Sequence, residues 1–259
     1  NNFKDNYSTK FEVFEGAKQS GLTIGILSAL IQAGTFEGFQ MSRSKIVYEG
    51  QLWNILLKKE KAAALKLAEK FDYDLVKIVK ELCGMKDDKG KLIIKESRLQ
   101  TIKKRTDAYK EIYRKNNRSE SFANWFYENN LLGYTYGKRL IDIFAEKTNG
   151  LMSVSEVEDS EVDEGVAFVG TIEDKPFFGK SRNDNEYMKV FIKDETAVMK
   201  VMIFNKKLAK MIVENANKHP EQGNIVIVRG VKKDEVVFAD QIAIQTNKIY
   251  TKLSDLKES

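Results

Sequence analysis

The sequence contains very little of the chemistry on which disulfide, zinc and histidine-dependent sites are built. Its 259 residues include one cysteine, Cys83, and one histidine, His219. A disulfide framework and a zinc cluster of cysteine and histidine ligands are therefore excluded. A nucleophile activated by histidine would have to use His219. That residue lies in a segment with a proline and a glycine, which predicts an exposed turn.

The sequence also lacks long apolar runs, and it has only two prolines. No stretch approaches the roughly 18 apolar residues of a membrane span, and the first residues lack the apolar segment of a secretory signal. With 42% hydrophobic and 31% charged residues, the composition is typical of a globular protein, and the length allows two domains. We therefore expect a cytoplasmic protein that does not associate with a membrane.

The excess of basic residues is small, at +5 for the whole chain, but it is unevenly distributed. Residues 1–150 carry a net charge of +8, residues 151–164 carry −6, and residues 165–245 carry +2. The acidic segment lacks strong apolar periodicity, which is typical of a surface connection. We therefore expect an acidic linker at 151–164 between a helical region at 1–150 and a second domain at 165–246, followed by a tail at 247–259.

The first region is expected to be all α. Its apolar side chains recur at helical spacing, first between residues 42 and 70 and then over residues 75–82. The sequence Asp-Asp-Lys-Gly at 87–90 predicts a turn. A longer basic helix is expected after it, over residues 97–116.

The region after the linker predicts a small β-barrel. Short runs rich in β-branched and aromatic residues, typical of strands, span 166–172, 187–193, 197–204, 225–231 and 236–244. An amphipathic helix is predicted between the third and fourth runs, over 204–217. Three strands, a helix and two strands is the order of an OB-fold, a five-stranded Greek-key barrel that binds oligonucleotides and oligosaccharides. A small five-stranded barrel without a ligand fits the same pattern.

The barrel sequence offers rings for base stacking and cations for phosphates, the combination with which OB-folds bind single strands. The candidates are Phe177, Phe178, Lys180 and Arg182 in the expected loop between the first two strands, Lys189, Phe191 and Lys193 on one side of the second strand, and Arg229 near the end of the fourth. Packing of Phe191 against a neighbouring domain is an equal alternative. The sequence Lys-Lys-Asp-Glu at 232–235 is typical of a solvated polar turn.

In the helical region, residues 17–25 predict a short hairpin between two helices. A helix N-terminus with free backbone N–H groups can hold a phosphate without reading bases. The candidates are Ser20, Gly21, Thr23 and Gly25. We expect the second helix to bury one face through Ile24, Leu27, Leu30 and Ile31.

The basic helix is a second candidate for binding the DNA backbone. Residues 95–118 carry a net charge of +6, with Lys103, Lys104 and Arg105 as its densest part. Phosphate contacts from such a helix would make DNA binding strongly salt-dependent. A solvated helix face is an equally common interpretation.

Four segments carry a resemblance to a known family. They are FEVFEGAKQSGLTIGILSALIQAGTFEGFQMSRSKI at 11–46, ENNLLGY at 128–134, and the barrel segments 169–172 and 188–204. In this order they resemble the C-terminal region of the α subunit of bacterial DNA polymerase III, a C-family replicative DNA polymerase. The first resembles the family's helix-hairpin-helix, especially LIQAGTF at 30–36 with Arg43 after it. The others resemble the segment before the family's OB-fold domain and strands of that domain.

One segment departs from the family. After Tyr134 the family has Ser-Gly-His-Pro, whereas residues 136–139 here are Tyr-Gly-Lys-Arg. This difference indicates a divergent member, such as one encoded by a phage. Between Gly84 and Tyr134 there is no convincing Gln-x-x-Leu-Phe-like motif for a sliding clamp, so the clamp is left open as a partner.

The resemblance implies a non-catalytic part of a DNA-directed DNA polymerase, a nucleotidyltransferase. The family's catalytic carboxylates lie upstream in a palm domain, and Mg²⁺ is expected only there, with no cofactor in this chain. Here no paired carboxylates lie on apolar strands, which two-metal catalysis would need. The resemblance adds Arg43 to the DNA contacts of the hairpin. The implied partners are primer–template and single-stranded DNA, the rest of the polymerase and other replisome proteins.

We therefore predict an α+β chain with two domains, an all-α region with a helix-hairpin-helix at about 11–46 and a five-stranded OB-fold barrel. The first would grip primer–template duplex and the second the single-stranded template, without sequence specificity, in a bacterial or phage-infected cell. The alternative is a module that docks replisome proteins and binds DNA only incidentally.

Overall fold

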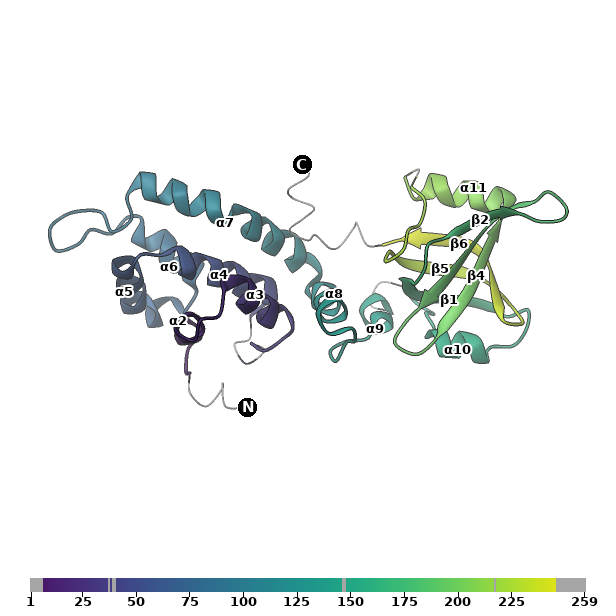
Figure 1. Ribbon diagram of the computed structural model, residues 1–259, viewed down its shortest axis with the longest axis horizontal. Coiled ribbons are helices and arrows are strands. Elements are labelled where there is room, and N and C mark those ends of the chain that lie inside the picture. The colour runs from purple at the N-terminus through teal and green to yellow at the C-terminus, as the bar shows by residue number, and fades with distance from the viewer. Residues whose placement is uncertain (1–6, 37, 39–40, 146–147, 217, 246–259) are drawn as a thin grey trace. The chain divides into compact units, whose positions relative to one another are not determined.

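The computed structural model describes residues 7–36, 38, 41–145, 148–216 and 218–245. Within these ranges the chain forms two compact units, a helical unit that ends at Glu120 and a barrel unit that begins at Ser121. Figure 1 labels most of their helices and strands. No helix of the described ranges is long and apolar enough to cross a membrane.

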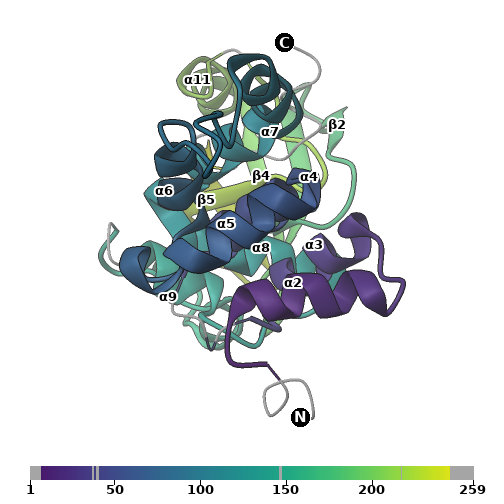
Figure 2. The same ribbon diagram turned by 90° about the vertical axis from the view of Figure 1, so that its left-hand side faces the viewer.

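The helical unit, whose helices are labelled in Figure 2, is built around one central helix. In the described residues its helices are α2 (Lys10–Gln19), α3 (Ile24–Gln32), α4 (Arg43–Ile55), α5 (Lys58–Leu67), α6 (Leu75–Leu82) and α7 (Glu96–Asn116), with 3-10 turns η2 (Glu69–Phe71) and η3 (Asn117–Ser119). Helix α4 contacts α2, α3, α6 and α7. Because it packs on several sides, most of its residues are buried. The predicted basic helix is confirmed as α7.

Short polar side chains mark the helix starts. The N-cap residues Thr9, Thr23, Ser42 and Asp74 each accept a backbone N–H from three residues later, at 3.0 to 3.3 Å. The helical spacing over residues 42–70 belongs to two helices rather than one. The helix stops at Leu56, whose ψ of 138° is extended. Helix α5 then begins where Oε2 of Glu60 accepts the backbone N–H of Leu57 at 2.7 Å.

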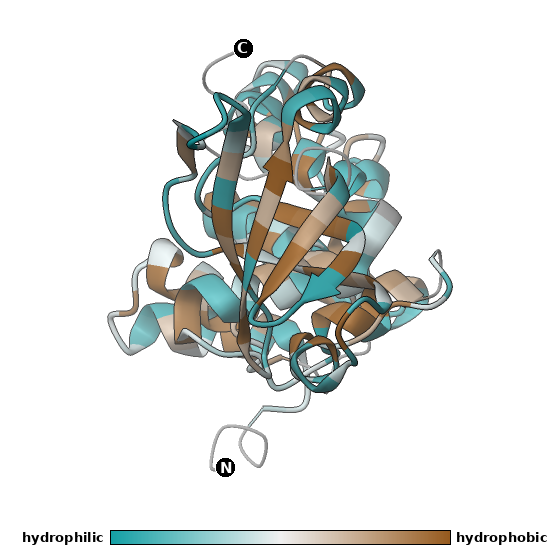
Figure 3. Ribbon diagram, turned by 90° about the vertical axis from the view of Figure 1, so that its right-hand side faces the viewer, coloured by the Kyte–Doolittle hydropathy of each residue, from teal (hydrophilic) through white to brown (hydrophobic). Residues whose placement is uncertain are grey.

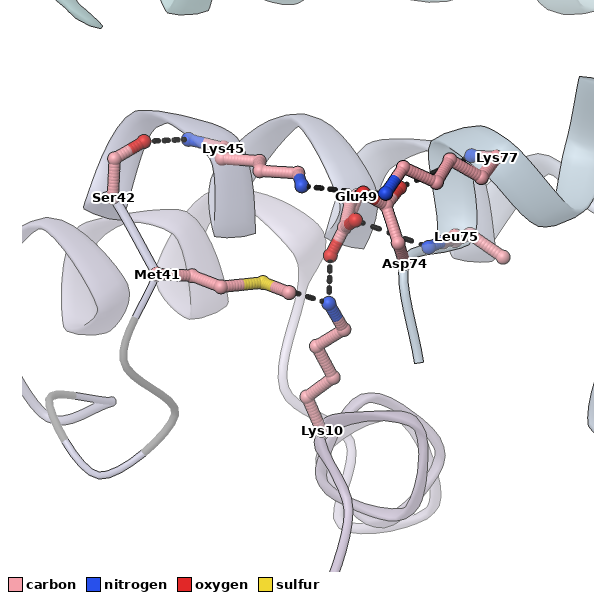
Figure 4. A network of polar contacts seen from close by, with 8 residues as sticks. All are labelled: Lys10, Met41, Ser42, Lys45, Glu49, Asp74, Leu75 and Lys77. Atoms are coloured by element: carbon pink, nitrogen blue, oxygen red, sulfur yellow. Dashed lines mark hydrogen bonds and ion pairs between the residues drawn. The ribbon is translucent and has the colours of Figure 1, made fainter. Parts of the chain in front are cut away.

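A buried ion pair lies inside the helical unit (Figure 4). Lys10 of α2 pairs with Glu49 of α4, and both side chains are at most 2% exposed. Oε1 of Glu49 accepts the backbone N–H of Leu75 at 3.1 Å, and the neighbouring Asp74 accepts from Nζ of Lys45 at 2.7 Å. Burial raises the pKa of Glu49 and lowers the pKa of Lys10, because the cost of desolvating each charge exceeds the attraction of its partner. The network ties α2, α4 and the start of α6 together.

Residues 17–25 form a tight connection between α2 and α3. Gly21 takes a left-handed φ of 76°, which glycine adopts without steric cost. Leu27 and Ile31 are buried as expected, whereas Leu30, expected with them, is 38% exposed. Leu27 and Ile31 are four residues apart and define the buried stripe of the helix, and Leu30 lies at the edge of that stripe.

The barrel unit contains a closed five-stranded barrel of the OB type with one additional short strand. The strands are β1 (Gly165–Ile172), β2 (Phe177–Lys180), β3 (Glu186–Lys193), β4 (Val198–Phe204), β5 (Ile225–Lys233) and β6 (Val236–Ile244), and α11 (Asn205–Glu214) follows β4. They pair in the order β1-β5-β6-β4-β3-β2, and β1 also pairs with β3, which closes the barrel. The β4–β6 pair is parallel and the others are antiparallel. This Greek-key arrangement confirms the predicted OB-type barrel.

The predicted strands agree with β1, β3, β4, β5 and β6 to within two residues at each end. Hydrophobic segments run along the barrel strands, with hydrophilic ones between them (Figure 3). The side chains of alternate residues fill the barrel interior: on β3, Met188, Val190 and Ile192 are at most 2% exposed. The barrel closes where Gly170 lies against β3. A Cβ atom at this position would lie 2.7 Å from the carbonyl oxygen of Lys193, so the absence of a side chain allows β1 to meet β3.

Helices α8 (Glu120–Leu132), α9 (Leu140–Ala145) and α10 (Val154–Asp159) belong to the barrel unit. Phe122 and Trp125 of α8 pack with Val169 of β1 and Ile225 of β5. The helical region expected to reach residue 150 therefore ends near residue 120, because the aromatic face of α8 is buried in the barrel unit.

The segment expected as an acidic linker is partly folded onto the barrel. Val154 and Val157 of α10 are fully buried in the barrel core. The acidic side chains of this segment stay outside, which is why its composition resembles that of a surface connection. The expected tail at 247–259 lies outside the described residues.

Candidate nucleic-acid interface

The β2–β3 hairpin places two neighbouring phenylalanines on different faces. Phe177 pairs with Lys189 and Phe178 with Met188, and neighbouring residues of a strand point to opposite sides. Phe177, 51% exposed, joins the outer face of the barrel. Phe178, 46% exposed, lies edge-on to His219 with the ring centroids 5.3 Å apart. The segment expected as a loop therefore contains a strand that separates the two rings.

Four aromatic rings form a continuous row across the outer face, one each from β2, β3, β4 and β6. This aromatic row consists of Phe177, Tyr187, Phe204 and Phe238. Consecutive ring centroids are 6.0, 5.8 and 5.4 Å apart, distances at which tilted and edge-to-face rings attract. The two end rings are the most exposed, with Phe238 at 39%. The row therefore offers ring surface on which flat ligands can lie.

Lys189 lies near two rings, that of Phe177 in the aromatic row and that of Phe191 outside it. Its Nζ lies 5.4 Å from the ring centroid of Phe177 and 6.0 Å from that of Phe191, within the range of a cation–π contact. Lys200 of β4 stands opposite Phe191 in the strand register. Within the described part of the chain, no carboxylate lies at ion-pair distance from Lys189 or Lys200. Both positive charges are therefore available to an anion.

Two other predicted cations of the barrel have carboxylate partners. Lys193 lies 3.5 Å from Glu173, and Lys180 lies 3.4 Å from Asp184. These pairs are exposed, so little free energy is lost when a phosphate replaces the carboxylate. The remaining predicted cations, which are exposed, are Arg182 and Arg229.

An open groove of about 620 Å³ lies beside Phe191. The groove is lined by Glu158, Phe191, Val198, Met199, Lys200, Lys232, Asp234 and Glu235. It lies where the β5–β6 turn approaches β4, since Lys200 pairs with Val236. Among the described residues, no group of three or more His, Cys, Asp or Glu side chains is arranged to hold a metal ion.

The connection between α2 and α3 places most of the candidate residues of the helical unit at the surface. The exposed candidates are Ser20, Gly21, Thr23 and Gly25. Arg43, in contrast, is 5% exposed and donates from Nη1 to the carbonyl oxygen of Gln32 at 2.9 Å. Arg43 binds the C-terminal end of α3, and its buried position offers no surface to a phosphate. Arg43 therefore stabilises the end of α3 and is not exposed to a DNA backbone.

The basic helix exposes its densest cations. Lys103, Lys104 and Arg105 lie between Ile102 and Thr106, which are each 2% exposed. Since α7 packs against α4 through its buried side, the three cations face solvent. Their position permits contact with a phosphate backbone.

Several residues of the outer face are missing from the sequence-based candidates. They are Tyr187, Lys200, Phe204 and Phe238. Tyr187 lies two residues before Lys189 on the same side of its strand, so the alternation already present in the sequence could have found it. Phe238 depends on the parallel β4–β6 pair, which joins strands far apart in the chain and leaves no local signal.

No protein-family model matches the sequence, and no curated protein matches it. The solved structures similar to the chain include yeast Stn1 and Ten1, at 14% identity and a TM-score of 0.28, with 32% of this chain and 43% of that chain covered. They also include Rim1, a mitochondrial single-stranded DNA binding protein of S. cerevisiae, at 16% identity and a TM-score of 0.28, with 33% and 98% covered. The N-terminal domain of a Thermoanaerobacter PriB protein is similar at 15% identity and a TM-score of 0.24, with 32% and 96% covered. Because these TM-scores are low, the solved structures do not identify the residues of the interface, which follow from the geometry of this chain alone.

Proposed function

We propose that the outer face of the barrel binds single-stranded DNA. The observation that carries this proposal is the aromatic row with Lys189 beside it. Every base has a face that can stack on a ring, and a neighbouring cation can meet the phosphate. The row lies on β3, β4 and the strands beside them, and the corresponding face of OB-folds binds oligonucleotides. Because bases of every kind can stack on these rings, we expect the binding to depend little on the DNA sequence.

Fluorescence anisotropy of the full chain with a labelled single-stranded oligonucleotide tests this proposal. Phe177→Ala should weaken binding by about 5- to 150-fold, equivalent to the roughly 1–3 kcal/mol expected for one stacked base. Phe178→Ala, on the other face of the same strand, should stay within about twofold of the wild type. The two side chains are identical and similarly exposed, so unspecific effects on the hairpin are matched. Equal weakening in the two variants, or none for Phe177→Ala, would contradict the proposal.

We further propose that the chain is the C-terminal, DNA-gripping part of a C-family replicative polymerase of a bacterial or phage-infected cell. This setting rests on the sequence resemblance. In it the helical unit holds primer–template duplex through the backbone of the segment at 20–25 and through Lys103, Lys104 and Arg105. Such contacts bind phosphates and carry no sequence information. The catalytic carboxylates and their Mg²⁺ would belong to an upstream palm domain.

Binding to a blunt duplex tests the role of the helical unit. Replacing Lys103, Lys104 and Arg105 with glutamine should lower duplex affinity. The log–log slope of affinity against salt should flatten by about 0.9 for each DNA phosphate that the variant no longer neutralises. A control that replaces Lys58, Lys59 and Lys66 of α5 removes the same charge from another exposed surface.

The two triple variants separate three outcomes. Weaker binding in the α7 variant alone supports the proposed duplex grip. If both variants bind equally weakly, only general charge is involved. Unchanged affinity in both variants at low salt would favour the alternative, a module that docks replisome proteins.

A further inference from the structure

The groove beside Phe191 differs from the aromatic row in the polar groups that line it. Asp234 and Glu235 of the β5–β6 turn bring two exposed carboxylates next to the apolar side chains of Phe191 and Val198. A strand stacked on the row directs its bases toward the protein and its phosphates toward solvent and lysines. Where such a strand passes the groove, the carboxylates meet base edges rather than phosphates.

Lys232 provides a second, independent observation. Its side chain lines the groove, is 6% exposed and donates from Nζ to the carbonyl oxygen of Glu158 at 3.0 Å. An ammonium group has three donors, and within the described residues no carboxylate lies at ion-pair distance from this one. A nearly buried cation with one neutral acceptor favours a ligand that brings further acceptors into the groove.

We propose that the groove is a base-selective subsite that takes an amino-bearing base, with cytosine as its best ligand, from the strand bound on the aromatic row. The amino group of cytosine donates to a carboxylate of Asp234 or Glu235, and its neighbouring ring acceptors receive hydrogen bonds from Lys232 or Lys200. The ring of Phe191 supports the face of the base. Single-stranded bases are recognised in this way, on an aromatic ring and at the Watson–Crick edge.

Thymine fits the same groove poorly. It presents a carbonyl oxygen where cytosine presents the amino group, so acceptor would face acceptor at Asp234 and Glu235. The inference rests on the proposed strand binding and adds a base preference that stacking alone does not give. Both bases are pyrimidines of similar size, so the preference depends on hydrogen bonding.

The experiment compares anisotropy of labelled oligo(dC) and oligo(dT) of about 12 nucleotides, within the range of OB-fold sites, at neutral pH and one salt concentration. The full chain should bind oligo(dC) about tenfold more tightly, equivalent to about 1.4 kcal/mol. The variant Asp234→Asn with Glu235→Gln should bind both with nearly equal affinity, because amides can donate to thymine. Asparagine also tolerates the positive φ of 45° at position 234.

A matched control is available in the helical unit. Glu69→Gln with Asp72→Asn makes the same charge change, and Asp72 is also exposed with a positive φ of 49°. This control should retain the tenfold preference for oligo(dC). Thermal unfolding followed by circular dichroism verifies that both double variants remain folded.

Other outcomes would contradict the base-selective subsite, and they distinguish its failure from a failure of the proposed strand binding. Equal binding of oligo(dC) and oligo(dT) by the wild type overturns the base-selective subsite and leaves strand binding intact. Equal strengthening of both affinities in the groove variant shows that Asp234 and Glu235 only repel DNA, which also overturns it. Absence of binding to either oligonucleotide overturns the proposed function itself.

Discussion

Trp125 of α8 donates its indole N–H to Oε1 of Glu195 across 2.6 Å. The same oxygen accepts the backbone N–H of Leu140 at 3.0 Å, so one carboxylate in the β3–β4 turn binds both α8 and the start of α9. A hydrogen bond to a charged group is stronger than one between neutral groups. Glu195 therefore connects helices α8 and α9 to the β3–β4 turn, which lies at one end of the proposed DNA-binding face.

Glu195→Ala should destabilise the barrel unit by about 1–3 kcal/mol, because it leaves the indole N–H of Trp125 without its acceptor. Urea denaturation followed by tryptophan fluorescence measures the change. Glu221→Ala removes an exposed glutamate elsewhere in the unit and should shift the midpoint little. Equal midpoints for the two variants would show that the hydrogen bond contributes nothing to stability.

The aromatic row predicts which part of Tyr187 matters for DNA binding. Tyr187→Phe keeps the ring and should retain nearly all single-strand affinity, whereas Tyr187→Ala should weaken binding by about 1–3 kcal/mol. Anisotropy at constant salt distinguishes them. Much weaker binding in Tyr187→Phe would point to a role for the hydroxyl group and speak against stacking.

Lys189 should account for part of the salt dependence of strand binding. Lys189→Gln is expected to reduce the slope of log affinity against log salt by about 0.7, the value for one phosphate contact on a single strand. Lys210→Gln on α11 removes a charge that is already paired with Glu214 and should leave the slope unchanged. An identical slope for Lys189→Gln and the wild type would place the phosphates elsewhere.

The buried pair of Lys10 and Glu49 predicts strongly non-additive mutations. Lys10→Met alone or Glu49→Gln alone should destabilise the helical unit by about 3–5 kcal/mol, because each leaves the other group buried without its partner. The combination Lys10→Met with Glu49→Leu should be much less destabilising, since apolar groups then replace both charges. Denaturation of all three variants tests this, and additive effects would contradict it.

Asp74 predicts a decrease of stability in acid. Burial works to raise its pKa, but the hydrogen bond from Lys45 and the backbone N–H of Lys77 outweigh burial and hold the pKa below the ordinary value of 3.8. A carboxyl whose pKa is lowered by folding stabilises the protein above its unfolded pKa, and this contribution disappears as the pH falls through the folded pKa.

The variant Asp74→Asn, which keeps an N-cap side chain, isolates this charge. It should be less stable than the wild type at about pH 5 and above, with the difference shrinking as the pH falls below 3.8. Urea midpoints across this range measure it. A difference that does not depend on pH would refute the assignment.

Much of the fold could be predicted because its signals are local. The alternation of Met188, Val190 and Ile192 with polar neighbours defines β3, and similar patterns define the other barrel strands. The packing of α8 on the barrel is harder to predict, because Phe122 and Trp125 bury their rings against Val169 and Ile225, which lie far along the chain. The composition of α8 does not indicate which surface its aromatic side chains pack against.

The candidate interface could be predicted only in part, for the same reason. Lys189 and Phe191 follow from the alternation of one strand, and both lie on the outer face. The ring of Phe204 meets Phe238 only through the pairing of β4 with β6. The resemblance predicts Arg43 as a DNA contact, whereas in the folded chain Arg43 is buried and donates to the carbonyl oxygen of Gln32.

Among the described strands, β2 pairs with β3 alone, so one edge of it remains open to another chain. Natural sheets prevent edge-to-edge aggregation with very short edge strands, lysines and prolines. Here β2 has four residues, Pro176 precedes it, and Lys175 and Lys180 flank its two phenylalanines. This edge can therefore display Phe177 to a nucleic-acid strand while it resists polymerising with copies of itself.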